Sequence, residues 1–347
     1  MTQPLRIGFI GAGGNTRLMH LPRFKAIEGV ELAVVCNRSE ASSQKVAEEF
    51  GIARTAPDWR AVVADPEVDA VCIGTWPYTH AEMTVAALEA GKHVLCEARM
   101  ARSLEEATSM LKAAQKYPEL VAQIVPAPFS FKYDATIMQM LAEGTLGALR
   151  EIRVAHLTGA GADASTPITW RQDAGLSGKN IMTMGIHYET VQRWLGEKDP
   201  AWVQATGAIY TPERPDAQTG QMKPVGIPDT LNVVAGYEDG FQLVMTFSSV
   251  ATGAAYWGMR VDGSQASLRY DLSSQSLFRT TVEQGSEEPL SAIPGTEGDW
   301  QVEEDFVASI RDGKAVTLTS FEDGARYMRF TERVWESWTS EGRRVAF

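Results

Sequence analysis

The sequence predicts a two-domain α/β chain, in which a parallel sheet flanked by helices precedes an α+β domain with a large, mostly antiparallel sheet. Two observations predict it. Apolar runs alternate with amphipathic stretches from residue 5 to about residue 126, as in a parallel sheet with crossover helices. Between residues 201 and 283 the apolar runs follow one another without helical stretches between them, as in an antiparallel sheet. We therefore predict domains at 1–126 and 127–347.

Composition narrows the class of protein. The 347 residues allow two or three domains, and 44% hydrophobic with 22% charged residues is ordinary for a globular chain. A net charge of −12 argues against nucleic-acid or anionic-membrane partners, which need basic patches. The first predicted strand begins at Leu5 and no apolar run is as long as a membrane span, so we expect neither a signal peptide nor a membrane anchor.

The cysteines and histidines show no pattern that indicates a disulfide framework or a metal site. Cys36, Cys72 and Cys96 lie in or at the end of apolar runs, so we expect them to be buried and reduced, as in a cytoplasmic protein. The five histidines have no ligand spacing, and no metal centre is expected.

The first domain contains five strand-like runs, at residues 5–11, 30–37, 70–76, 92–98 and 120–126. Helices are predicted at 39–50, at 80–90 with Thr79 as its N-cap, and from Ser103, which with Glu106 has the spacing of a capping box. Ligands of parallel sheets bind beyond the carboxyl ends of the strands, so the loops after these runs are the places to look for a site.

The loop after the first strand is rich in glycine. Gly11 permits a tight turn, and Gly13 lets the backbone approach a bound pyrophosphate, toward which the following helix points free N–H groups. The third glycine of the G-x-G-x-x-G pattern falls on Thr16, so the match is incomplete and an ordinary glycine-rich turn is the alternative. Its position after the first strand favours a dinucleotide site made of Gly11, Gly13, Gly14, Asn15 and Thr16.

The loop after the second strand bears on which nicotinamide cofactor is bound. NAD-specific sites usually place a carboxylate here to hold the ribose hydroxyls, whereas this chain has Asn37, Arg38 and Ser39. A cation and a hydroxyl suit a 2′-phosphate, so we predict NADP(H) over NAD(H), with NAD possible. The alternative is that Arg38 is only a solvated residue at a helix start.

Two further loops complete the predicted cofactor site. Pro77 fixes the turn of the first loop, and Trp76 or Tyr78 can pack against the nicotinamide or the adenine. His80 is counted with the cofactor site, although bracing the helix start is its more ordinary role. The residues assigned to the cofactor from these loops are Thr75, Trp76, Pro77, His80 and Glu97.

The second domain begins with a predicted helix at 133–143 and a strand at 148–157, followed by a small-residue loop at 158–167 and a helix at 179–195. Further strands are predicted at 201–210, 230–237, 241–250, 258–263, 266–272 and 276–283, with turn signals at 238–240 and 262–263 and a loop at 211–228. The last helices are expected at 300–310 and 322–340, and the final one is expected to pack back on the first domain.

In several stretches the chain resembles the glucose–fructose oxidoreductase, inositol dehydrogenase and MocA (Gfo/Idh/MocA) family. They are the glycine loop, WPYTH at 76–80, KHVLCEARMARSLEEA at 92–107, TWRQDAGLSGKNIMTMGIHYETVQRWLG at 169–196 and GARYMRFTERVWESWTSEGRRV at 324–345. The resemblance implies an N-terminal Rossmann domain and a C-terminal domain with a large sheet. It also implies hydride transfer between a nicotinamide cofactor and a sugar, a polyol or a related carbonyl.

The chain departs from the family at two positions that handle protons. The family's lysine lies in a Glu-Lys-Pro motif and works with an aspartate and a histidine of the second domain. Glu97 matches the glutamate, but Ala98 stands in place of the lysine and Arg99 in place of the proline. In the second motif His187 matches, whereas Thr183 stands where the aspartate is expected.

These departures leave His187 as the residue of the family's set that readily exchanges a proton near neutral pH, so we predict that it is catalytic. Arg99 stays protonated and can hold a carboxylate or polarise a carbonyl. The predicted substrate contacts are Arg171, Lys179 and Thr183. The alternatives are a buried, satisfied histidine for His187 and an exposed lysine for Lys179.

The function that follows is an NAD(P)-dependent oxidoreductase, with NADP(H) favoured, acting on a sugar-like or polyol-like substrate. Two alternatives stay open, namely redox-neutral lyase or hydrolase chemistry with a recycled cofactor and a sensor without catalysis. Family analogy implies a homodimer or homotetramer formed through the C-terminal sheet. Its outer face is predicted to carry Val233, Tyr237, Val244, Thr246 and Tyr256.

Overall fold

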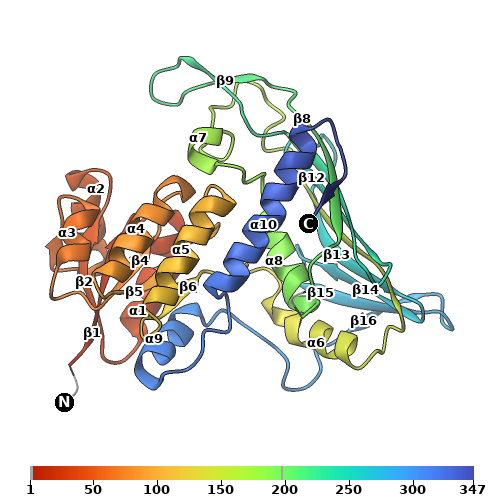
Figure 1. Ribbon diagram of the computed structural model, residues 1–347, viewed down its shortest axis with the longest axis horizontal. Coiled ribbons are helices and arrows are strands. Elements are labelled where there is room, and N and C mark those ends of the chain that lie inside the picture. Colours follow the sequence, from red (N-terminus) through yellow and green to blue (C-terminus); the bar gives the residue numbers. More distant parts are fainter. Residues whose placement is uncertain (1–2, 197) are drawn as a thin grey trace. The chain divides into compact units, whose positions relative to one another are not determined.

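The computed structural model describes residues 3–196 and 198–347 and divides into two compact units (Figure 1). The first unit comprises the chain up to Pro126 together with Gln301–Met328, and the second comprises Ala127–Trp300 and Arg329–Phe347. The division falls within α10 (Phe321–Thr339), so this helix contributes to both units.

The first unit is built on a six-stranded parallel sheet in the order β3-β2-β1-β4-β5-β6. Its strands are β1 (Leu5–Ile10), β2 (Val30–Cys36), β3 (Arg54–Thr55), β4 (Ala70–Ile73), β5 (His93–Cys96) and β6 (Ala122–Ile124). The central strands are almost wholly buried, because helices cover both faces of a parallel sheet. This architecture confirms the predicted fold class.

Helices alternate with these strands, and their starts correct two expectations. They are η1 (Thr16–His20, a π-helix), α1 (Leu21–Ala26), α2 (Glu40–Phe50), α3 (Trp59–Ala64), α4 (Pro77–Glu89), α5 (Leu104–Lys116) and α9 (Val302–Asp312). Thr79 is not the N-cap of its helix, because α4 begins at Pro77, whose fixed φ suits the first helical position. Ser103 caps α5 as expected, but the carboxylate of Glu106 accepts from the N–H of Arg102 instead of that of Ser103. The short elements β3 and α3 were not predicted.

Close approach of the first and fourth strand ends explains the incomplete glycine pattern. A Cβ at Gly74 would lie 2.0 Å from Thr16 Oγ1 and 2.6 Å from the carbonyl oxygen of Gly11. Thr16 therefore occupies the third glycine position because residue 74 has no side chain. Gly11 has φ +80°, and a Cβ there would meet Thr75 Cγ2 at 2.5 Å.

A buried ionic network joins η1, the end of β5 and α9 within the first unit. His20 is fully buried and donates from Nε2 to Glu97 (3.0 Å) and from Nδ1 to Glu303. Burial alone would lower the pKa of His20, but the hydrogen bonds to Glu303 and Glu97 outweigh it and raise the pKa to about 9. His20 is thus a buried cation held by two carboxylates.

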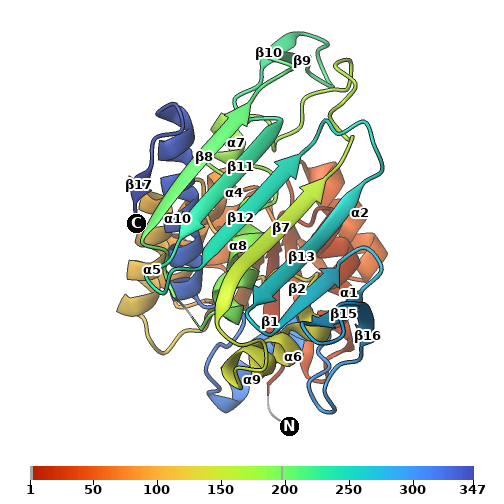
Figure 2. The same ribbon diagram turned by 90° about the vertical axis from the view of Figure 1, so that its right-hand side faces the viewer.

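The second unit is built on a nine-stranded sheet in the order β16-β15-β14-β13-β7-β12-β11-β8-β17 (Figure 2). Its strands are β7 (Leu149–Leu157), β8 (Trp202–Ala208), β11 (Thr230–Gly236), β12 (Gln242–Ser248), β13 (Tyr256–Gly263), β14 (Ala266–Asp271), β15 (Ser276–Thr281), β16 (Glu287–Leu290) and β17 (Val345–Ala346). β7 pairs parallel with β12, and the other neighbouring pairs are antiparallel. The second hairpin turn falls after Gly263, which pairs with Leu149, and not at 262–263 as predicted.

The helices of this unit are α6 (Phe131–Ala142), α7 (Ala174–Ser177) and α8 (Met184–Trp194), and α8 lies behind the sheet in Figure 2. The helix predicted at 179–195 is therefore too long at its start, where Met182 has φ +46° and interrupts helical geometry. The predicted loop at 211–228 contains a small hairpin of β9 (Glu213–Pro215) and β10 (Met222–Pro224).

Burial along the strands separates the two faces of the large sheet. Val233 and Tyr237 are buried, so they belong to the core and not to the outer face as predicted. Val244 and Thr246 are partly exposed and Tyr256 is 47% exposed, as residues of an outer face should be.

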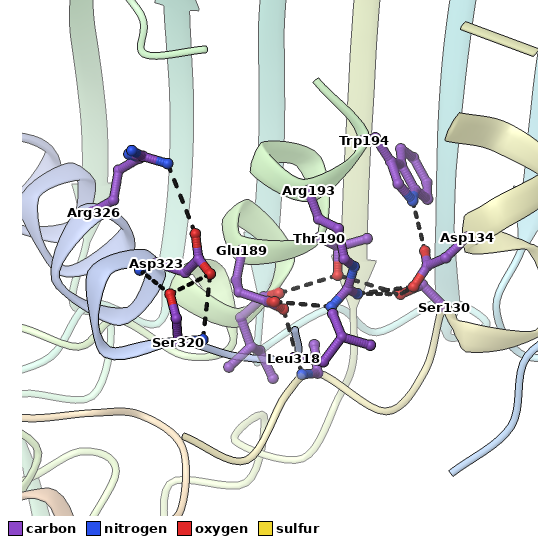
Figure 3. A network of polar contacts seen from close by, with 12 residues as sticks. Ser130, Asp134, Glu189, Thr190, Arg193, Trp194, Leu318, Ser320, Asp323 and Arg326 are labelled. Carbon is purple, nitrogen blue, oxygen red and sulfur yellow. Dashed lines mark hydrogen bonds and ion pairs between the residues drawn. The ribbon is translucent and has the colours of Figure 1, made fainter. Parts of the chain in front are cut away.

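A buried polar cluster fastens α6 to α8 (Figure 3). Asp134 accepts from Trp194 Nε1 (2.6 Å) and pairs with Arg193 (2.9 Å). Arg193 also pairs with Glu189 (2.9 Å), and Ser130 donates to Asp134 (3.0 Å). Because every charge here has an opposite neighbour, the helices can pack closely without leaving a buried ion uncompensated.

All three cysteines of the chain are free and buried, as predicted, and burial raises the pKa of each thiol. Within the described residues no helix is both long and apolar enough to cross a bilayer.

We expect Gly74→Ala to lower the free energy of unfolding by roughly 1–3 kcal/mol, because the new methyl group overlaps Thr16 and the backbone of Gly11. Gly14→Ala is the matched control, since a Cβ there meets nothing within 4 Å and the change should stay within about 0.5 kcal/mol. Urea unfolding of both variants measures this, and equal stabilities would contradict the packing argument.

The His20 network predicts alkaline destabilisation. Since the pKa of His20 is raised from 6.5 to about 9, its contribution to stability is complete below 6.5 and is lost as the pH rises through 9. The free energy of unfolding should fall by up to about 1.4 kcal/mol per pH unit across that interval.

Unfolding of the Glu303→Gln variant between neutral and alkaline pH tests the source of this slope, which should become shallower. His93→Gln is the control, because burial lowers the pKa of His93 and its ring is neutral throughout this interval. A slope that survives Glu303→Gln unchanged would rule out the network as its cause.

Candidate functional site

A first candidate site, within the first unit, is the edge of the six-stranded sheet where β1 and β2 end. Asn37 Oδ1 accepts from the N–H of Ala12 (2.7 Å), and its Nδ2 donates to Ser42 Oγ (3.0 Å). Asn37 therefore ties the glycine loop to the start of α2. Ser39 caps that helix by accepting from the N–H of Ser42 (3.4 Å).

Arg38 is exposed beside this loop. Across residues 3–196 and 198–347, no carboxylate lies within ion-pair distance of its guanidinium group, so the charge is available to a ligand.

The glycine loop fits a dinucleotide. The nearest heavy atoms to a Cβ at Gly13 would be 3.9 Å away, and none would lie within 4 Å of one at Gly14, so both residues face open space. The first helical turn that follows has N–H groups without intrahelical acceptors, which suit a pyrophosphate. Thr16 is buried against Gly74, so its side chain supports the loop and does not reach toward a ligand.

The loop after β4 is braced by His80. This side chain is fully buried, with Nδ1 3.0 Å from the carbonyl oxygen of Arg99 and Nε2 3.1 Å from that of Thr75. Burial lowers its pKa. His80 therefore joins two loops of the site and is not itself available to a cofactor, which corrects its assignment. Trp76, in contrast, is 38% exposed and able to meet a ligand.

The loop after β5 holds the matched glutamate. Glu97 accepts from the side chain of Asn15, from His20 and from the N–H of Ala98 (3.2 Å). Its carboxylate thus fastens the glycine loop to the end of β5. Ala98 offers no proton-exchanging group, and the side chain of Arg99 is buried.

A second candidate site is a pocket of about 270 Å³ within the second unit. Its polar lining consists of hydroxyls, an amide, two guanidinium groups and one imidazole, and it includes no carboxylate. The lining residues that carry these groups are Thr158, Thr166, Thr169, Thr183, Ser248, Ser249, Gln172, Arg171, Arg214 and His156. A pocket of this kind suits a small polyhydroxylated molecule.

His187 does not fit the role predicted for it. Its ring is fully buried, with Nδ1 donating to the carbonyl oxygen of Thr183 (2.8 Å) and Nε2 accepting from Trp257 Nε1 (2.8 Å). Burial lowers its pKa to about 3, so the ring is neutral at physiological pH. Both nitrogens are occupied, and His187 acts as a packing residue beneath the pocket.

His156 is the titratable residue that the structure places in the pocket lining. Its Nδ1 lies 2.9 Å from Thr183 Oγ1, and Nε2 has no partner in the described parts of the chain. The ring stacks on Trp257 with centroids 5.1 Å apart, and partial burial lowers its pKa. The sequence contained a signal for it, because His156 shares strand parity with Ile152 and Val154 and so faces the covered side of the sheet.

Two of the three predicted substrate contacts line the pocket and the third does not. Arg171 and Thr183 line the pocket as expected. Lys179 does not line it and is instead a partly buried lysine in an ion pair with Glu332, which is not the exposed lysine of the alternative. Among the described residues no group of three or more His, Cys, Asp or Glu side chains is placed to hold a metal ion.

Comparison with known proteins agrees with this architecture. Residues 5–123 match the oxidoreductase family with an NAD-binding Rossmann fold, and residues 135–269 match the GFO/IDH/MocA C-terminal domain. Levoglucosan dehydrogenase of Pseudarthrobacter phenanthrenivorans is 26% identical, over 96% of this chain and 95% of that protein. Myo-inositol 2-dehydrogenase of Thermotoga maritima is 25% identical, over 81% of this chain and 79% of that protein.

Among solved structures, an oxidoreductase domain protein from Kribbella flavida superposes with a TM-score of 0.85 at 26% identity, covering 99% of both chains. The two family matches follow each other in the expected order and cover most of the chain. The chain therefore belongs to the Gfo/Idh/MocA family of oxidoreductases.

Proposed function

We propose that the protein is a dehydrogenase or reductase that moves a hydride between NADP(H) and a CH–OH carbon of a sugar-like or polyol-like substrate. The observation that carries the proposal is the hydroxyl-lined pocket with His156 in its wall, in a chain that also has an open glycine loop. The named activities of the two relatives support a cyclic sugar or polyol as the substrate.

The cofactor site belongs to the first unit. Gly13, Gly14 and the first turn after them would hold the pyrophosphate, and Trp76 would pack against a ring of the cofactor. Arg38 and Ser39 would hold a 2′-phosphate, while Asn37 offers no carboxylate to repel it. The bound nicotinamide would supply the hydride acceptor or donor.

The chain's own residues must move the hydroxyl proton. Because Ala98 and Thr183 carry no such function and His187 is closed off, His156 is the residue that remains. Thr183 Oγ1 orients the imidazole through Nδ1, which leaves Nε2 to exchange a proton with the substrate hydroxyl. In oxidation Nε2 accepts this proton, and in reduction it returns one. The side chain of Arg99 is buried in the first unit, so no substrate contact is proposed for it.

Two wider features belong to the same proposal. The free, buried cysteines fit a cytoplasmic protein. The outer face of the large sheet, with Val244, Thr246 and Tyr256, would form the contact in a homodimer or homotetramer. Tight cofactor binding without net oxidation or reduction would instead favour the redox-neutral or sensor alternatives.

Arg38→Gln should weaken NADPH binding roughly 10- to 100-fold, because one charge-assisted contact to the 2′-phosphate is lost. NADH binding should change less than about threefold. Quenching of tryptophan fluorescence by each dinucleotide gives both dissociation constants. Equal affinity of the unaltered protein for NADPH and NADH would contradict the NADP preference.

His156→Gln should lower the turnover of substrate oxidation roughly 10²- to 10⁴-fold. In the unaltered protein kcat/KM should fall as the pH drops through the lowered pKa of His156, because a protonated imidazole cannot accept the hydroxyl proton. This acidic limb should vanish in His156→Gln.

His187→Gln is the matched comparison, and it should reduce stability while keeping the acidic limb, since the ring of His187 is already neutral. If the acidic limb of the kcat/KM profile disappears in His187→Gln, or persists in His156→Gln, the proton-transfer role belongs to His187.

A further inference from the structure

We infer that the substrate of this pocket carries an anionic group, a carboxylate or a phosphate, which contacts Arg171. This inference rests on the proposed function and narrows its substrate class. The pocket lining carries two guanidinium groups and no carboxylate, although the whole chain has a net charge of −12.

Arg171 is the accessible member of the pair. It is exposed, and its guanidinium carbon lies 4.3 Å from the centre of the Trp170 ring. Within the described ranges no carboxylate comes within 4.0 Å of it, whereas other arginines of the unit, such as Arg193 and Arg269, pair with acidic side chains. Stacking on Trp170 orients the guanidinium plane. The N–H groups along the edge of this plane can then donate two parallel hydrogen bonds to an anion.

Arg214 makes the pocket wall positive from within. It is fully buried and donates to the carbonyl oxygens of Gly161, Asp163 (2.8 Å) and Thr166 (3.3 Å). Its Nε has no hydrogen-bond partner in the described chain. Carbonyl dipoles satisfy part of this guanidinium, and the exposed carboxylate of Asp163, which does not line the pocket, offsets part of its charge. A buried cation with only partial compensation is costly, and a substrate anion in the adjoining pocket would reduce that cost.

The carboxylates of the surrounding segments accept hydrogen bonds from backbone N–H groups. Asp163 accepts from the N–H of Ser165 (2.8 Å), Asp173 from that of Gly175 (2.8 Å) and Asp229 from that of Tyr210 (2.7 Å). None of the three lines the pocket. The lining hydroxyls can both donate to and accept from sugar hydroxyls, so the pocket can hold the polyol part of a substrate while the arginines hold its charge.

The test is isothermal titration of the full-length protein, saturated with NADP⁺, with matched sugars. Glucuronate and glucose differ in a carboxylate, and glucose 6-phosphate adds a phosphate to the same ring. At least one anionic sugar should bind tenfold or more tightly than glucose, and added salt should weaken it. The tighter of the two anions identifies the source of the charge.

Arg171→Gln should weaken the preferred anion roughly 10- to 100-fold and change glucose less than about threefold. Arg344→Gln is the matched control, because Arg344 is also exposed and stacks on a tryptophan, Trp202, at 3.8 Å, but does not line the pocket. It should leave all three affinities unchanged.

The inference is overturned if glucose binds as tightly as both anions, if none of the three sugars binds, or if Arg171→Gln and Arg344→Gln behave alike. The proposed function fails separately, if the bound sugars are neither oxidised with NADP⁺ nor their carbonyl forms reduced with NADPH. Anion preference with no turnover would therefore keep the charge assignment and reject the dehydrogenase.

Discussion

The hydrogen bond from Trp257 to His187 is the contact on which the arrangement of the second unit depends. It joins β13 to α8, while the other nitrogen of His187 holds the carbonyl oxygen of Thr183, just before that helix begins. The same tryptophan stacks on His156, its cross-strand neighbour. One buried imidazole thus connects β13 and α8 to Thr183, which lines the pocket. The burial of His187 holds these elements in place, and it also lowers the pKa of the ring.

The relation between Thr183 and His156 shows how a replaced side chain changes a site. A carboxylate at position 183 would favour the protonated form of the neighbouring imidazole. A hydroxyl can orient a neutral imidazole without altering its charge. In the proposed function, proton exchange is therefore assigned to the strand residue His156. In the first unit, the carboxylate of Glu97 holds His20 and Asn15.

Local periodicity was sufficient to predict the fold. The runs around Ile7, Val71 and Leu95 are buried on both faces and the strands after residue 201 alternate, so sheet type could be predicted from pattern alone. What failed depends on contacts between distant residues. The pairing of Thr16 with Gly74, and the ion pair of Lys179 with Glu332, join positions 58 and 153 residues apart, which no local pattern records. The surroundings of His187 could not be predicted for the same reason, since its hydrogen-bond partner Trp257 is 70 residues away.

The three cysteines have a practical consequence. The thiolate is the nucleophile that attacks a maleimide, and burial disfavours the thiolates of Cys36, Cys72 and Cys96. We therefore expect the folded chain to react slowly with maleimides, so that no cysteine has to be removed before labelling. A single cysteine introduced at an exposed position, such as Tyr210 or Val282, would carry a fluorophore at one known place. Two such labels on one chain would allow the distance between the labelled positions to be measured by energy transfer.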